Sequence, residues 1–297
     1  MSEEEYKQEW LNGMHQTEYN ACRFSNNKIQ YCFDWLNKNV PDWNVRTDII
    51  KNVCAQKLKI ASNKDYQKKC QDWADKLTAY YKAQKILGNR YVLPTYEIEN
   101  IAEAGTFLGT RDNIIVKCNH GSGWNRLINL HQPYGESEKK LNEWLTLNYA
   151  YMTGYEAQYE NITPTLIAQR EFTTHPLDWG FWCVNGEIQG ISLTKKLGKN
   201  LEEYIGFVDE NGKYNSWYIG AEPQMRNLPK SWDYQLEGLK EIAKTLSNGF
   251  DFVRVDLYSI KGKTIFSELT FYPNGGFAPF YPIEWEYRIG NWIKLKK

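Results

Sequence analysis

The sequence predicts an α+β fold, in which a mostly helical N-terminal region precedes two regions that combine strands with helices. Two observations lead to this prediction. Through about the first 90 residues apolar side chains recur at helical spacing, as at Ile49, Ile50 and Val53. After about residue 91 short apolar runs end at glycine-containing turns, and Asn185-Gly186 is the strongest short signal for a β-hairpin.

The helical region is predicted to end at Gly88-Asn89, which follow a continuous amphipathic stretch over residues 72–87. Two further helices are predicted over residues 137–151 and 234–246, each with apolar side chains on one face. Strands are predicted over residues 112–118, 165–172, 180–184, 187–193, 250–260 and 264–271.

Charge and composition restrict the classes of function. The 297-residue chain has 36 Lys and Arg and 36 Asp and Glu. This balance gives no overall attraction to nucleic acid or an anionic membrane, so we expect no nucleic-acid partner, and any phosphate site must be local. No apolar run approaches the roughly 18 residues of a membrane span. The N-terminus does not resemble a secretory signal, and the six cysteines contain no C-x-x-C pair. We therefore expect a cytoplasmic protein without a membrane span.

The C-terminal hairpin carries the most specific chemical signal. In the strand F-V-R-V-D-L-Y (252–258), Arg254 and Asp256 share a face because strand side chains alternate. Glu268 on the partner strand can lie near Asp256 across the ladder. Two close carboxylates need a neutralising cation, and Mg²⁺ prefers oxygen ligands and shares nucleotide phosphates. Arg254 could bind a phosphate or a developing oxyanion. The alternative is a solvated hairpin face with an Arg–carboxylate pair.

A second signal is Lys117 at the end of an apolar strand, followed by the small loop Gly121-Ser122-Gly123. The lysine would supply charge for a phosphate, and the glycines would let backbone N–H groups close over a triphosphate. The spacing matches neither a P-loop nor a dinucleotide fingerprint, and an ordinary turn is the alternative. His120, beside the loop, could contact phosphate or lie in a surface turn. A third signal is the strand over residues 165–172, which ends in Gln169-Arg170-Glu171 and could present backbone groups to an adenine edge.

In this order, the lysine strand, glycine loop, hinge strand and acidic hairpin resemble the ATP-grasp ligases. The R-V-D (254–256) and E-L-T (268–270) pair is similar to the metal end of D-alanine–D-alanine ligase and of the ribosomal-protein glutamate ligases. The closer resemblance is to the TupA-like ATP-grasp family of cell-surface polysaccharide loci, from about residue 24 to residue 295. It rests on F-S-N-N-K-I-Q (24–30), A-D-K (74–76), I-I-V-K-C-N-H-G-S-G (114–123), D-W-G-F-W-C-V-N-G-E (178–187), F-V-R-V-D-L-Y (252–258) and F-S-E-L-T-F-Y-P-N-G-G (266–276).

The resemblance implies an ATP-grasp fold in which two α+β lobes clasp a nucleotide, with ATP and Mg²⁺ as cofactors. Residues 1–93 would form the helical region, 94–168 the small lobe with the glycine loop, and 169–297 the large lobe with the metal site. The residues implied to bind ATP are Lys76, Lys117, Gly121, Ser122, Gly123, Gln169, Arg170, Glu171 and Phe172. Those implied to hold metal are Asp256 and Glu268, with Thr270 or Asn274 as the third ligand. Arg254 would steady the oxyanions of an acyl phosphate.

Two departures from the family pattern bear on catalysis. Gly180 stands where the family usually has a lysine, and Lys195-Lys196 where it often has Asp-Arg. Loss of the lysine removes one positive charge from a phosphate or substrate site. Lys195 or Lys196 could restore that charge and are further catalytic candidates. Otherwise the chain could bind nucleotide with altered or lost turnover.

The function that the resemblance implies is ATP- and Mg²⁺-dependent ligation of a carboxylate to an amine through an acyl phosphate. The partners would be small-molecule or glycan substrates, such as a sugar acid of a capsule or another cell-surface polysaccharide, or its precursor. This substrate choice is analogy. The alternatives are an ATP-dependent sugar kinase or glycosyltransferase of a polysaccharide locus, and a non-catalytic nucleotide-binding protein, which Gly180 favours. The sequence does not give the oligomeric state.

Overall fold

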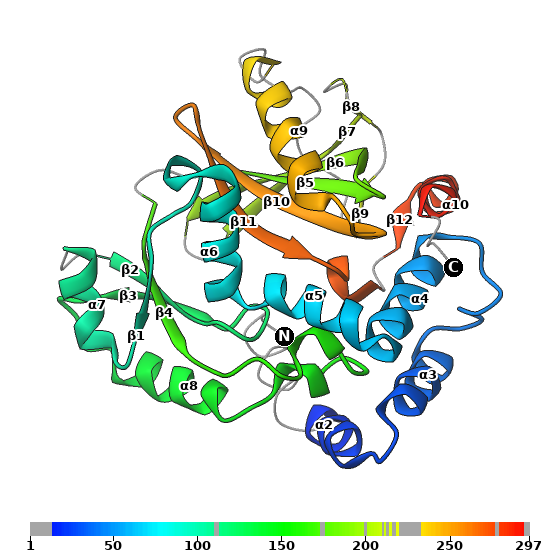
Figure 1. Ribbon diagram of the computed structural model, residues 1–297, viewed down its shortest axis with the longest axis horizontal. Coiled ribbons are helices and arrows are strands. Elements are labelled where there is room, and N and C mark those ends of the chain that lie inside the picture. The colour runs from blue at the N-terminus through cyan, green and yellow to red at the C-terminus, as the bar shows by residue number, and fades with distance from the viewer. Residues whose placement is uncertain are drawn as a thin grey trace.

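The computed structural model describes residues 14–109, 113–172, 176–198, 201–209, 211, 214–215, 218–219, 233–276 and 279–293 (Figure 1). Helices come first in this part of the chain, and two antiparallel sheets follow, one of four strands and one of six. The predicted α+β class and the helical N-terminal region are confirmed. The N-terminal helices are α2 (Met14–Phe24), α3 (Lys28–Asn39), α4 (Ile49–Ser62), α5 (Lys64–Ala74) and α6 (Lys76–Leu87).

The prediction of one continuous helix over residues 72–87 is wrong, because Asp75 separates α5 from α6. Its carboxylate accepts the backbone N–H of Leu77 at 3.0 Å and the hydroxyl of Thr78 at 2.7 Å, which caps the first turn of α6. The apolar stripe continues across the break, so its spacing could not reveal it. The break makes Lys76 the first residue of α6, and Gly88 ends that helix as predicted.

The four-stranded sheet has the order β1-β4-β2-β3, with the bounds β1 (Thr95–Ile98), β2 (Asn113–Cys118), β3 (Asn125–Asn129) and β4 (Leu166–Arg170). Helices α7 (Ile101–Leu108) and α8 (Gly135–Leu145) cover one of its faces and share a hydrophobic core with it. Neither β1, β3 nor α7 was predicted, since these short segments carry little periodicity. Helix α8 ends earlier than predicted, and η2 (Tyr149–Tyr151) and η3 (Ala157–Tyr159) follow it as single 3₁₀ turns.

The six-stranded sheet has the order β11-β10-β5-β6-β7-β8. Its strands are β5 (Leu177–Val184), β6 (Glu187–Gly198), β7 (Leu201–Val208), β8 (Tyr214–Asn215), β10 (Phe252–Ile260) and β11 (Lys263–Thr270). Helix α9 (Asp233–Ser247) packs on β5, β6 and β10. Asn185 and Gly186 both have positive φ, 51° and 84°, as the predicted hairpin turn requires. After η5 (Pro273–Gly276) come β12 (Phe280–Tyr281), which pairs with β9 (Tyr218–Ile219), and α10 (Ile283–Trp292).

The larger of two hydrophobic cores joins the N-terminal helices to the six-stranded sheet, and the smaller lies under the four-stranded sheet. Helices α5 and α6 run between the two sheets, and α6 contacts both β1 and β11 (Figure 1). The helical region is therefore packed into the larger lobe. The lobe limits at residues 93 and 168 stay a prediction, and β4, which crosses residue 168, belongs wholly to the four-stranded sheet.

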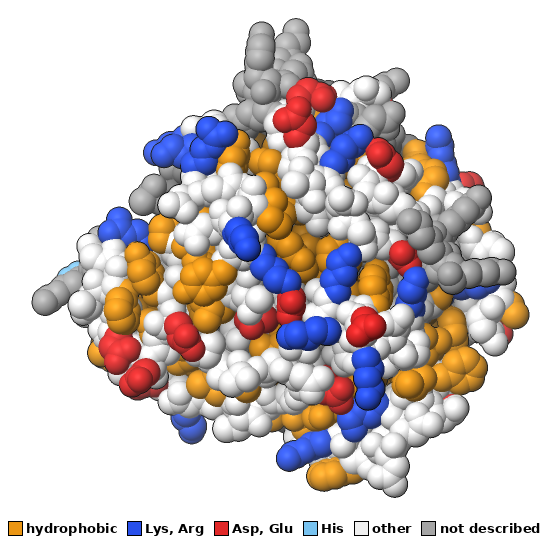
Figure 2. Space-filling model, in the orientation of Figure 1, with side chains coloured by type: hydrophobic (Ala, Val, Ile, Leu, Met, Phe, Trp, Pro, Cys, Tyr) orange, Lys and Arg blue, Asp and Glu red, His pale blue; other side chains and the backbone are white. Residues whose placement is uncertain are grey.

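Acidic and basic side chains are interspersed on the face that Figure 2 shows, in line with the 36 residues of each sign in the chain. None of the helices in the described ranges is long and apolar enough to cross a bilayer.

Candidate nucleotide and metal site

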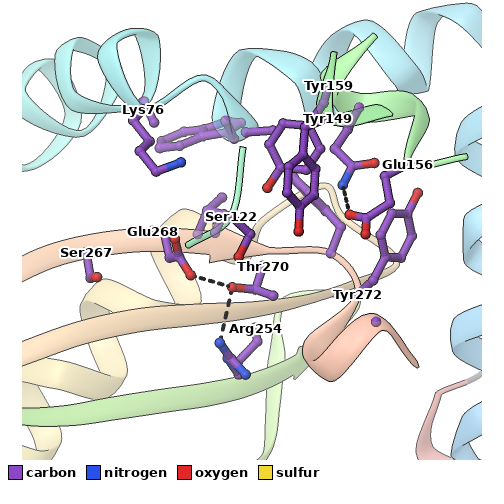
Figure 3. A pocket seen from close by; sticks show the side chains of 17 residues that line it. Lys76, Ser122, Tyr149, Glu156, Tyr159, Arg254, Ser267, Glu268, Thr270 and Tyr272 are labelled. Carbon is purple, nitrogen blue, oxygen red and sulfur yellow. Dashed lines mark hydrogen bonds between the residues drawn. The ribbon is translucent and has the colours of Figure 1, made fainter. Parts of the chain in front are cut away.

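A cavity of about 220 Å³ lies between the β10–β11 hairpin, the start of α6 and the segment between α8 and β4 (Figure 3). Its walls come from both lobes, so side chains distant in sequence face a common space. The lining residues are Trp73, Ala74, Lys76, Ala79, Ser122, Tyr149, Glu156, Gln158, Tyr159, Arg254, Ser267, Glu268, Leu269, Thr270, Phe271, Tyr272 and Gly275.

The two acidic residues of the hairpin meet as predicted. Asp256 lies directly opposite Glu268 in the β10–β11 ladder, and Arg254 lies opposite Thr270. The hydroxyl oxygen of Thr270 is 2.8 Å from Asp256 Oδ2 and 3.2 Å from Glu268 Oε1, so it lies between the two carboxylates. Just beyond this pair the register shifts, which leaves Ser267 as an extra residue on β11. The bulge places Glu268, rather than Ser267, opposite Asp256.

Arg254 occupies both oxygens of Asp256. Its Nε donates to Oδ1 at 2.6 Å and its Nη2 to Oδ2 at 2.8 Å. Asp256 is 4% exposed, and this burial raises the pKa of its carboxyl, although the charge of Arg254 opposes the rise. Burial also disfavours the Arg254 cation, but the neighbouring Asp256 raises the pKa of Arg254 above its ordinary value. Glu268, by contrast, is exposed at the cavity.

The donor set of the hairpin fits Mg²⁺ by its chemistry. Within the described ranges no group of three His, Cys, Asp or Glu side chains could hold a metal ion. Mg²⁺ is usually held by one or two carboxylates together with phosphates and waters. Glu268 and Asp256 therefore match the type and number of protein ligands that Mg²⁺ requires. Asp256 can join such a site only when Arg254 releases it. The side chains of Asn274, Lys195 and Lys196 lie outside those that the structure describes.

Lys76 is the cation that the helix break brings to the cavity. Its ammonium donates to the carbonyl oxygen of Gly121, so it joins α6 to the loop after β2. Burial lowers the pKa of Lys76, while the charge of Glu268 acts in the opposite direction. The Lys76 ammonium can bind a phosphate, and a cation that binds together with the phosphate would compensate the Glu268 carboxylate.

The glycine loop is more tightly packed than its composition indicates. A Cβ on Gly121 would lie 2.6 Å from the Trp124 ring and 2.8 Å from the Tyr149 ring, so another residue there would require these rings to move. Gly123 has a φ of 71°, a conformation that favours glycine. Of the three predicted loop residues, Ser122 lines the cavity.

His120 is neither in a surface turn nor at the cavity. It is 1% exposed, with Nε2 3.1 Å from the carbonyl oxygen of Leu147, and its ring packs edge-on against Trp124. Burial lowers the pKa of His120. The interpretation of His120 as a surface residue is therefore wrong. Its side chain packs beside the glycine loop, against Trp124.

Lys117 and Gln169 lie on the same face of the four-stranded sheet. Lys117 pairs with Ile167 and Gln169 with Ile115, and this face is opposite to the one that α7 and α8 cover. Gln169 donates to the hydroxyl of Thr95 at 2.7 Å. Neither residue is among those that line the 220 Å³ cavity. Their predicted contacts with ATP therefore stay a prediction.

The rest of the predicted adenine hinge divides between two environments. The guanidinium of Arg170 donates to the carbonyl oxygen of Leu108, with Nε at 2.9 Å, and so caps the end of α7. The ring of Phe172 packs edge-on against Tyr258 at 5.3 Å. Glu171, between them, is half-buried. The side chain of Arg170 thus has a structural role, and backbone contacts with adenine stay a prediction.

Gly180 lies directly under the hairpin site. It pairs with Asp256 across β5 and β10, and a Cβ at this position would lie 2.4 Å from Ser192 Oγ and 3.0 Å from Arg254 Cδ. The hydroxyl of Ser192 donates to the carbonyl oxygen of Gly180 at 3.2 Å. The side chains of Ser192 and Arg254 therefore fill the space that a side chain at position 180 would need.

A group of cavity residues was missed in the sequence. Tyr149, Glu156, Gln158, Tyr159 and Tyr272 form much of the lining, and they come from 3₁₀ turns and from the segment after β11. Such irregular segments have no periodicity that could mark one side as facing a site. The high aromatic content, 15% of the chain, does not single out these residues.

A family model described as TupA-like ATPgrasp matches residues 56–294. The chain belongs to the TupA-like ATP-grasp family. The predicted family and the ATP-grasp fold are thus confirmed. Within this TupA-like ATP-grasp chain, the matched range includes Lys76, the loop after β2 and the whole β10–β11 hairpin.

Several solved structures share partial similarity with this TupA-like ATP-grasp protein. D-alanine–D-alanine ligase from Helicobacter pylori is 14% identical, with a TM-score of 0.43, over 74% of this chain and 61% of that one. L-amino acid ligase from Bacillus licheniformis is 12% identical, with a TM-score of 0.43, over 76% and 49% of the two chains. D-alanine–D-alanine ligase from Bacillus anthracis is 11% identical, with a TM-score of 0.37, over 67% and 56%. The chain thus spans about half to three fifths of these proteins. No curated protein matches it.

Proposed function

We propose that this protein is an ATP- and Mg²⁺-dependent ligase that joins a carboxylate to an amine through an acyl phosphate. The observation that carries the proposal is the pairing of Asp256 with Glu268 on adjacent strands, beside Arg254 and Thr270, at a cavity that Lys76 also lines. Membership of the TupA-like ATP-grasp family supports ATP as the nucleotide.

The cavity suits the reacting end of the nucleotide. Its volume of about 220 Å³ is below the roughly 300 Å³ of small ligand pockets, so it would take the phosphates and the substrate carboxylate but not a whole nucleotide. Lys76 and Arg254 present positive charge to this space. When bound, Mg²⁺ would neutralise charge on the phosphoryl group as it moves.

The residues of this chain would act by orientation and charge. Glu268 would hold the metal from its exposed position, and Asp256 would join it as Arg254 turns from Asp256 toward the phosphate or acyl oxygens. Lys76 would bind phosphate while the loop around Ser122 covers it, which keeps water from the acyl phosphate. The substrate carboxylate would attack the γ-phosphorus of ATP, with ADP as the leaving group. The amine would then attack the carbonyl carbon of the acyl phosphate, lose a proton and displace phosphate, which gives the amide.

A sugar acid of a capsule or another cell-surface polysaccharide, or its precursor, is the carboxylate that we propose. We place the reaction in the cytoplasm, which the six cysteines support, because all of them are buried free thiols. A second candidate is a protein that binds nucleotide without turnover. The closed Arg254–Asp256 ion pair and the absence of a side chain at Gly180 favour it.

The test is an ADP-release screen with Mg²⁺ and a panel of sugar acids and amino acids, each with and without an amine. We expect ADP release that depends on both substrates, and an amide identified by mass spectrometry. A phosphosugar product would instead identify a kinase. Nucleotide binding without ADP release from any pair would identify the non-catalytic protein.

A further inference from the structure

One end of the cavity is not used by the proposed phosphate and metal chemistry. Figure 3 shows Tyr149, Tyr159, Glu156 and Tyr272 grouped on one side, with Lys76 and Glu268 on the other. The rings of Tyr149 and Tyr159 pack edge to face, with centroids 4.9 Å apart. This aromatic end has a single carboxylate, that of Glu156, among the residues that line it.

Two buried polar atoms at the aromatic end have no hydrogen-bond partner in the part of the chain that the structure describes. Gln158 is 2% exposed and Tyr272 is 5% exposed, yet Gln158 Oε1 and the Tyr272 hydroxyl make no hydrogen bond within the described part of the chain. Leaving a buried polar group unpaired costs about 1–3 kcal/mol. Gln158 and Tyr272 both line the cavity, so a ligand with polar hydrogens that binds there could supply the missing partners.

Glu156 is the charged member of this group. It is 8% exposed and accepts a hydrogen bond from Gln158 Nε2 at 3.1 Å. Burial raises the pKa of Glu156, and the charge of Lys57 opposes this rise. Lys57 does not line the cavity: its ammonium donates to the carbonyl oxygen of Thr153 and lies 5.5 Å from the centroid of the Tyr272 ring. Thr153 also hydrogen-bonds to Glu156. Because Glu156 lines the cavity, a cation bound there could compensate its charge.

We propose that the aromatic end binds the protonated amine of the acceptor substrate, with Glu156 as its counter-ion and the three tyrosines as an aromatic cage. Ammonium groups bind well to the faces of aromatic rings when a site is desolvated, and a buried carboxylate repels the competing carboxylate substrate. The assignment rests on the proposed ligase function and names the amine subsite within it. Because the cavity holds about 220 Å³ in all, the acceptor amine is carried on a compact group.

The experiment is a titration of the full-length protein with ethanolamine, followed by NMR of the ligand, with ethylene glycol as the neutral probe of similar size. Each titration is run with and without ADP and Mg²⁺. We expect saturable binding of ethanolamine, weaker by at least about tenfold in Glu156→Gln, and no saturable binding of ethylene glycol. Tyr272→Phe removes the unpaired hydroxyl and should weaken ethanolamine binding while the protein stays folded.

Glu99→Gln is the matched control, since Glu99 is exposed, lines a separate groove and undergoes the same chemical change. It should bind ethanolamine as the wild type does. The proposal is overturned if ethanolamine does not bind, if Glu156→Gln binds it equally well, or if ethylene glycol binds as tightly. Failure of ADP to bind in the same samples would count against the proposed function instead, because the titrations without nucleotide still test the amine site.

Discussion

The guanidinium of Arg254 holds both carboxylate oxygens of Asp256, with Nε 2.6 Å from Oδ1 and Nη2 2.8 Å from Oδ2. The neighbouring Glu268 is exposed and accepts a hydrogen bond from the hydroxyl of Thr270, 3.2 Å away. Two carboxylates that face each other across one ladder are therefore in different electrostatic states. We therefore expect substitutions of Asp256 and of Glu268 to have different effects.

Asp256→Asn should destabilise the fold as well as abolish turnover. Removing one partner of a buried ion pair leaves the Arg254 charge uncompensated, which costs about 3 kcal/mol. Chemical denaturation should show this loss, and Arg254→Met in the same chain should recover part of it. If Asp256→Asn is as stable as the wild type, the ion pair contributes little to folding.

Glu268→Gln should separate catalysis from stability. Because Glu268 is exposed, we expect the midpoint of thermal unfolding to stay near that of the wild type. Mg²⁺-dependent ADP release should fall by about a hundredfold or more, since a metal ion contributes several kcal/mol of transition-state stabilisation. Full activity in this variant would refute the assignment of Glu268 to the metal site.

Lys76→Met and Lys117→Ala test the two lysines implied to bind ATP. Lys76→Met keeps the aliphatic stem and removes the charge at the cavity, so ADP binding by calorimetry should weaken by about tenfold. Lys117→Ala should weaken it too. Lys85→Met is the control, because Lys85 is exposed on the same helix as Lys76. Unchanged affinity in either variant argues against that lysine.

Gly180→Lys should first of all destabilise the protein. The new Cβ would lie 2.4 Å from Ser192 Oγ and 3.0 Å from Arg254 Cδ, and such overpacking costs about 1–3 kcal/mol. The double variant Gly180→Lys/Ser192→Ala removes the closest contact. A double-mutant cycle on the free energy of unfolding should therefore show positive coupling between the two positions. Strict additivity would mean that the two residues do not compete for space.

Only in the relieved double variant does the added lysine test catalysis. Unchanged ADP release there would agree with Lys195 or Lys196 supplying the charge, whereas a gain would show that position 180 limits turnover.

The burial of Glu286 should make the free energy of unfolding depend on pH. Its carboxylate accepts the backbone N–H groups of Phe280 at 2.6 Å and Ile50 at 3.3 Å. Burial raises its pKa from 4.5 to about 7. Below about pH 4.5 the group is protonated in both states. Between pH 4.5 and 7 the unfolded chain ionises first, so stability falls as pH rises, by up to about 3 kcal/mol.

Urea unfolding at pH 5 and pH 8 tests this dependence. The wild type should lose more stability over this interval than Glu286→Gln, in which the titrating group is absent. Equal losses in the two proteins would mean that Glu286 keeps an ordinary pKa despite its burial.

The sequence by itself determined the fold class, the family and the placing of Asp256 and Glu268 on two successive strands of one hairpin. Alternation along each strand sets which side chains share a face. The register itself depended on the bulge at Ser267, which brings Glu268 rather than Ser267 opposite Asp256. The motifs that resemble the TupA-like family, and their order, can also be recognised in the sequence without a structure.

Only the tertiary structure decided which charges meet at the cavity and in what state. Asp75 breaks the predicted helix and brings Lys76 to the carbonyl of Gly121, 45 residues away. Arg254 closes on Asp256, and Glu156 gathers with Tyr149, Tyr159 and Tyr272. The physical reason is that periodicity reports neighbours within an element, whereas burial, which sets the strength of charges and the pKa of acidic groups, depends on packing between elements far apart in the chain.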